Sequence, residues 1–169
     1  MAILDIIEVP DERLREHSEA VSRFDEALQQ QVNDLFETLG HSGAIGLSAP
    51  QTGIFKRIIV VHVPDDDFGA RVYINPEILK RSKSRYVEES CLSVPGIEGN
   101  VVRCIRVKLR AQDIHGKLCE FDVDDLHAVC VQHEVDHLDG ILFTDRLSWF
   151  KKLRLRMASG GNTGLSRAA

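Results

Sequence analysis

The chain lacks the features that mark membrane, secreted and disulfide-stapled proteins. No uncharged apolar run approaches the roughly 20 residues of a membrane span, and the longest, at 58–61, predicts a strand. The first ten residues carry acidic side chains and no basic cluster, which predicts that there is no signal peptide. Only four cysteines are scattered through 169 residues, too few for a disulfide scaffold. We therefore expect a cytoplasmic protein with reduced thiols and no membrane contact.

Positive charge is also scarce, and it is unevenly placed. The net charge of −5 argues against a dedicated nucleic-acid-binding protein, and we expect no DNA partner. From Arg146 onward, however, there are six Lys or Arg and no acid, leaving 15 basic and 26 acidic residues in 1–145. An amphipathic helix predicted at 148–157 could contact an anionic partner, although a solvated helix face and a loose tail explain the charge equally well. The length and composition predict one catalytic domain over 1–157 and a disordered tail over 158–169.

Apolar periodicity predicts segregated helices and strands. One helix is predicted from an Asp25 cap to Gly40 and Gly43, and a second after Asp124 or Asp125. The glycine-rich stretch 43–53 predicts a loop. Strands are predicted at 57–63, 71–75 (ended by Pro76), 78–87, 105–111 and 118–123. Because these segments do not alternate regularly, we expect the α+β class.

The second helix carries the motif H-E-x-x-H, formed by His133, Glu134 and His137. Positions i and i+4 share a helix face, so both imidazoles could reach one metal ion. The predicted inward stripe of this helix is Leu126, Val129, Cys130, His133 and His137. A pair of core histidines satisfied by hydrogen bonds is the alternative explanation.

A catalytic metal site of this kind needs a third protein ligand. The downstream position used by one class of zinc proteases is Phe143, and no Glu, His or Cys follows His137. Cys130 lies seven residues before His137, about 10 Å along the helix axis, which favours a core role. Cys91, between a strand and a Pro-Gly turn, is the better candidate, with a buried thiol as the alternative.

Three segments, taken in order, resemble the motifs of the peptide deformylases. They are G-A-I-G-L-S-A-P-Q at 43–51, E-S-C-L-S at 89–93 and Q-H-E-V-D-H-L-D-G-I-L-F-T-D-R-L-S at 132–148. The resemblance extends to V-P-D-E-R-L-R, Y-I-N-P-E-I-L and D-I-H-G-K, and covers the chain to about residue 157. It implies antiparallel or mixed sheets packed around the motif helix, with a C-terminal helix.

The resemblance also implies a reaction and its metal. The reaction is hydrolysis of the N-formyl group from the initiator methionine of new polypeptides, with release of formate. One divalent metal ion per chain is held by Cys91, His133 and His137. Fe(II) is the expected native ion, with Zn(II), Ni(II) or Co(II) as substitutes.

By the same resemblance, Glu134 is the general acid and base, and the Gln51 amide and Leu92 backbone N–H stabilise the oxyanion. Ile45, Gly46 and Ser90 contact substrate. Ser90 stands where the family pattern has glycine, which raises the possibility of a paralogue with altered substrate or a binding-only role. A small H-E-x-x-H metallopeptidase is a further alternative. We expect N-formylmethionyl peptides as substrate, a monomer, and ribosome contact through the basic C-terminal helix.

Overall fold

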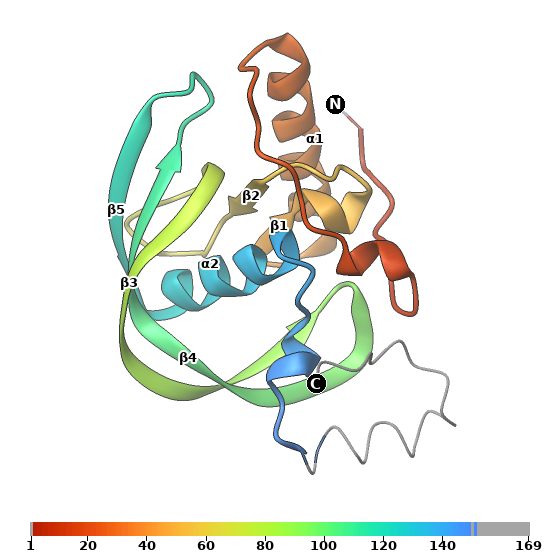
Figure 1. The fold of residues 1–169 in the computed structure, drawn as a ribbon, viewed down its shortest axis with the longest axis vertical. Coiled ribbons are helices and arrows are strands. Elements are labelled where there is room, and N and C mark those ends of the chain that lie inside the picture. Colours follow the sequence, from red (N-terminus) through yellow and green to blue (C-terminus); the bar gives the residue numbers. More distant parts are fainter. Residues whose placement is uncertain (1, 150, 152–169) are drawn as a thin grey trace.

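A computed structural model describes residues 2–149 and 151, and shows an α+β fold, as predicted. Five strands form one antiparallel sheet in the order β1-β2-β3-β4-β5, which curves around helix α2 while helix α1 lies outside it (Figure 1). The strands are β1 (Gly46–Ser48), β2 (Ile58–Val61), β3 (Arg71–Cys91), β4 (Val94–Gln112) and β5 (Leu118–Asp124). The helices are α1 (Glu26–Ser42) and α2 (Asp125–Leu138), with 3-10 turns η1 (Glu12–Arg15), η2 (Ala49–Thr52) and η3 (Phe143–Arg146).

Strand β3 is longer than predicted, because it continues through Pro76 instead of ending there. The pairing of β3 with β4 shifts register between Ile74 and Glu77, and Asn75 has a positive φ of 51°. Proline is tolerated in a strand at such a bulge, where its missing N–H breaks no ladder bond. The predicted strands at 71–75 and 78–87 are therefore one bent strand.

Helix α1 begins at the predicted cap, since the Asp25 side chain accepts a hydrogen bond from the Leu28 N–H. The expected stop at Gly40 is wrong: Gly40 lies inside the helix and Gly43 follows its end, with a φ of 71°. Only the position past the last turn requires the left-handed conformation that glycine adopts easily. The buried face of α1 packs on Ile58 and Val60 of β2.

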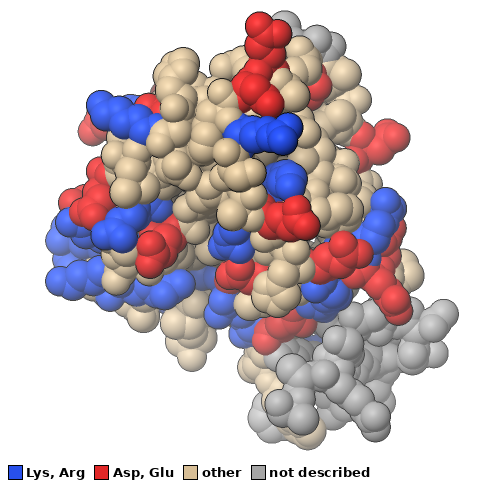
Figure 2. Space-filling model, turned by 45° about the horizontal axis from the view of Figure 1, so that its top comes forward, with Lys and Arg blue, Asp and Glu red and all other residues tan. Residues whose placement is uncertain are grey.

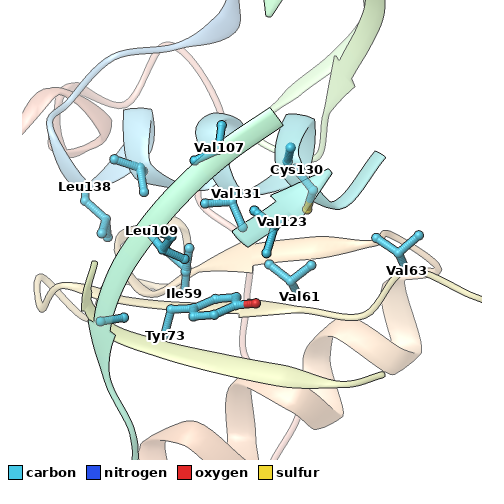
Figure 3. Packing of buried hydrophobic residues seen from close by; sticks show 13 residues of the cluster. Ile59, Val61, Val63, Tyr73, Val107, Leu109, Val123, Cys130, Val131 and Leu138 are labelled. Carbon is cyan, nitrogen blue, oxygen red and sulfur yellow. The ribbon is translucent and has the colours of Figure 1, made fainter. Parts of the chain in front are cut away.

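Helix α2 begins after Asp124, as predicted, and is buried on almost every side. Its Val131 and Leu138 pack with Ile59 of β2 and Leu109 of β4 (Figure 3). Leu126 was wrongly assigned to the inward stripe, because 47% of it is exposed at the first turn. A helix enclosed by a curved sheet has no single inward stripe, so periodicity could not define its faces.

The stretch 43–53 is more ordered than the predicted loop. It contains β1, which pairs with β2 through Gly46 and Val61, and the turn η2. The predicted helix at 148–157 and tail at 158–169 fall outside the described residues, apart from 148, 149 and 151. Among the described helices, none is long and apolar enough to cross a membrane.

Candidate metal centre

The fold brings the three candidate ligands together from two elements. Cys91 ends β3, while His133 and His137 lie one turn apart on α2. The Cys91 Sγ lies 3.3 Å from His137 Nε2, which lies 3.3 Å from His133 Nε2. All three ligand atoms are within 4.8 Å of one another, and they are the one such group of metal-ligating atoms in the described part of the chain.

The positions of the two imidazoles suit metal binding. His133 Nδ1 lies 2.8 Å from Glu89 Oε2 and donates to that carboxylate, which directs Nε2 toward Cys91 and His137. Burial would lower the pKa of His133, but hydrogen bonds with Cys91 and Glu89 outweigh it and raise this pKa well above its ordinary value, so a metal ion would take the place of a proton on Nε2. Burial lowers the pKa of His137 well below its ordinary value, which keeps that ring neutral. One thiol and two imidazole nitrogens with converging lone pairs fit a tetrahedral divalent ion that keeps one position open.

A buried ionic network holds Glu89, the carboxylate that accepts a hydrogen bond from His133. Arg103 of β4, only 3% exposed, donates to Glu89 at 2.7 and 3.0 Å and to Asp136 at 2.6 Å. Arg146 of η3 also donates to Asp136. Burial would raise the pKa of Glu89, but hydrogen bonds from His133 and Arg103 outweigh it and lower the pKa to about 2. Glu89 is therefore ionised whenever it accepts from His133.

Sequence reasoning missed this network. Glu89, Arg103 and Asp136 come from three elements, and an isolated charged residue in a strand normally predicts an exposed position. The weak available signal was that Glu89 and Asp136 lie inside the two motifs that carry the candidate ligands.

Glu134 lies beside the ligands and is buried. Burial raises the pKa of Glu134 to about 7, against the opposing attraction of His133. Its Oε2 atom has no hydrogen-bond partner among the described residues. Gly46 of β1 lies against it, since a Cβ on Gly46 would be 2.7 Å from Glu134 Oε1. A buried carboxylate that titrates near neutrality can exchange a proton with a reacting group.

Gln51 is held with its amide nitrogen toward Cys91. Its Oε1 accepts from the Ser48 backbone N–H at 2.9 Å and from the Ser48 hydroxyl at 2.7 Å. Its Nε2 donates to Ser93 Oγ at 3.1 Å and lies 3.7 Å from the Cys91 Sγ. With both acceptor positions of the oxygen used, the amide cannot flip without losing two hydrogen bonds.

A cleft of about 840 Å³ opens over these side chains. Eight of the nine predicted site residues line it, and His137 lies behind them. The eight are Ile45, Gly46, Gln51, Ser90, Cys91, Leu92, His133 and Glu134. The cleft also has apolar walls, which suit an apolar side chain bound next to the polar centre.

Cys130 and the other potential ligands near the motif make contacts away from the metal centre. The Cys130 Sγ lies 3.6 Å from the Ile45 carbonyl, and burial raises the pKa of this thiol well above its ordinary value. Asp139 forms an ion pair with Arg57 at 2.7 Å, and Asp145 pairs with Arg15. His127 of the same helix is buried between Tyr73 and Asp66, at 2.8 and 2.6 Å.

Comparisons with known proteins point to one family. The family model described as polypeptide deformylase matches residues 3–153. A peptide deformylase of Chromobacterium violaceum is 46% identical over 156 residues, 92% of this chain and 93% of that protein. The crystal structure of a Legionella pneumophila peptide deformylase superposes with a TM-score of 0.86 at 42% identity, covering 92% of each chain. An Ehrlichia chaffeensis peptide deformylase in complex with actinonin superposes with a TM-score of 0.85 at 36% identity, over 94% of this chain and 98% of that one. These matches favour a deformylase over the metallopeptidase and paralogue alternatives.

Proposed function

Because this chain belongs to the peptide deformylase family, a family of metal-dependent enzymes, we propose that it hydrolyses the N-formyl group of N-formylmethionyl peptides and releases formate. One observation carries the proposal. The thiol of Cys91 and two imidazoles converge within 4.8 Å, beside a buried carboxylate, Glu134, at the base of a cleft.

Cys91, His133 and His137 are the proposed ligands of one divalent ion. When bound, such an ion acts as a Lewis acid and lowers the pKa of a coordinated water. Fe(II) is the proposed native ion, and the donor set also suits Zn(II), Ni(II) or Co(II). Glu89 holds the ring of His133 in the orientation that ligation needs.

Glu134 is the proposed general base and acid. Its carboxylate takes the proton of the attacking water and then delivers it to the nitrogen of the leaving amine. Burial raises the pKa of Glu134 in the metal-free protein, which favours a carboxyl group that can hold a proton as well as accept one.

Gln51 and Leu92 are the proposed oxyanion donors. As the formyl carbon becomes tetrahedral, its oxygen gains negative charge, which prearranged N–H groups stabilise. The Gln51 amide nitrogen already faces the centre, and Leu92 lies next to Cys91 on the cleft wall.

Substrate lies in the cleft above these groups in the proposed complex. Ile45 and Gly46 of one wall and Ser90 of the other contact its backbone, and apolar residues surround the methionine side chain. The Ser90 hydroxyl, where the family pattern has glycine, adds a polar contact at the second wall.

Several broader features belong to the same proposal. α2 is the central helix of one catalytic domain over 1–157. The enzyme acts as a cytoplasmic monomer. Its basic C-terminal segment docks it on the ribosome, where N-formylmethionyl chains emerge.

The decisive experiment measures formate release from a formyl-Met tripeptide by anaerobically prepared protein, together with its metal content. We expect one metal ion per chain, lost in Cys91→Ala, and formate release lost in Glu134→Gln with the metal retained. The absence of formate release from metal-loaded protein would refute the function. Metal retained in Cys91→Ala would refute the ligand assignment alone.

A further inference from the structure

A run of basic side chains lies along the middle of β3, away from the cleft. From Ile78 to Val87 the strand contains Lys80, Arg81, Lys83 and Arg85 and no acidic residue. Arg106 of β4 lies across from Ser82 of β3. We call Lys80, Arg81, Lys83, Arg85 and Arg106 the basic ribbon. In Figure 2, Lys and Arg side chains gather at the lower left of the molecule, on the side where β3 to β5 lie in Figure 1.

The ribbon side chains form no ion pairs within the described structure, although Asp124 of β5 lies across from Arg106. All five side chains are exposed, and none has an ion pair or hydrogen bond there. Neighbouring cations differ, since Lys108 pairs with Glu120 at 3.0 Å and Arg110 pairs with Glu120 at 3.1 Å. The residues outside the described part contain no Asp or Glu, so no further carboxylate side chain can pair with the ribbon.

The surroundings of the ribbon suit a nucleic-acid strand. Residues 75–91 of β3 pair only with β4 in the described sheet, so the other edge of this stretch is open. Alternate side chains of a strand repeat about every 7 Å, which places cations in a row along an extended backbone. Tyr86 is 81% exposed and lies across from Val102, 51% exposed, on the outer face of the sheet. Arg81 and Arg85, whose partners Val107 and Arg103 are buried, lie with Lys83 on the other face, at the open edge of the strand.

An exposed aromatic ring beside a strand edge that carries cations and hydroxyls is typical of surfaces that bind single strands. Bases stack on the ring, while Lys, Arg and Ser contact phosphates and sugars. Basic side chains on an open edge also discourage aggregation, but that role needs no exposed aromatic and no acid-free run.

We propose that the basic ribbon, with Tyr86, binds the phosphate backbone of single-stranded RNA. The basic ribbon lies outside the catalytic cleft. It also shares no residue with the C-terminal segment that is proposed above to contact the ribosome. RNA binding by the ribbon can therefore be measured independently of deformylation and of ribosome docking through that segment.

The test is fluorescence anisotropy of a labelled uridine oligomer with the metal-loaded full chain over a range of salt concentrations. In Lys83→Gln/Arg85→Gln, the slope of log affinity against log salt should become shallower by about 1.4, for two lost phosphate contacts. Tyr86→Ala should weaken binding about five- to 160-fold. Arg23→Gln/Lys117→Gln removes the same charge from exposed positions outside the ribbon and should leave the slope unchanged.

Three outcomes would overturn the proposal. The parent protein could fail to bind the oligomer at low salt, a result that needs no variant. The ribbon and control variants could lose affinity equally. Polyglutamate, anionic vesicles or a thymidine DNA oligomer could bind more tightly than RNA, which would assign the ribbon to another partner. Formate release is measured on the same samples and should be unchanged in all three variants.

Discussion

Replacing Gly46 by alanine should damage both stability and the placement of Glu134. Gly46 is buried in β1, and an added Cβ would lie 2.4 Å from Cys130 Sγ and 2.7 Å from Glu134 Oε1. Both distances are far below contact, so α2 or the Glu134 side chain must move. Overpacking of this kind costs about 1–3 kcal/mol, equivalent to a fall in Tm of roughly 2–12 °C in a domain of this size. A displacement of Glu134, the proposed general base, by about 1 Å would lower kcat/KM on the order of 100-fold.

Two further variants test whether the steric clash is the cause of these losses. Gly40→Ala is the matched control, because its Cβ meets nothing within 4 Å inside α1, and it should stabilise the protein by roughly 0.5–1 kcal/mol. Cys130→Ala removes one of the two clashing atoms, so Gly46→Ala should cost less in that background, by about 0.5–3 kcal/mol. Thermal unfolding and formate release measure all of them. A Gly46→Ala protein with the Tm and activity of the parent would refute the close packing of β1 on α2.

Three other changes test the surroundings of the site. Arg103→Leu should lower the free energy of unfolding in urea by about 3–5 kcal/mol, because it leaves Glu89 and Asp136 buried without their cation; a loss below about 1 kcal/mol would contradict that role. Glu89→Gln should weaken metal binding about 10- to 100-fold in competition with a chelator, and unchanged affinity would show that His133 needs no such support. Truncation after Leu147 should preserve formate release from short peptides but weaken ribosome binding at low salt, and equal ribosome binding would exclude the C-terminal segment as the docking element.

Local chemistry explains what could be predicted. The cap at Asp25, the hairpin between β4 and β5 and the helix that begins after Asp124 each depend on residues close together in the chain. The same holds for the H-E-x-x-H pair, whose spacing alone places both imidazoles on one face. Errors arose where context overrides local preference, as at Pro76, which a bulge accommodates, and at Gly40, which a helix retains.

By itself, the sequence determined the α+β class, the helix with its two histidines and, through the three motifs, the family of the enzyme. Residue type and spacing are sufficient for such inferences. Only the tertiary structure decided that the Cys91 thiol meets those histidines, that Arg103 joins Glu89 to Asp136, and that no room remains beside Gly46. These contacts join β1, β3, β4 and α2 across long stretches of chain, and they depend on how a curved sheet encloses a helix, which no local pattern encodes.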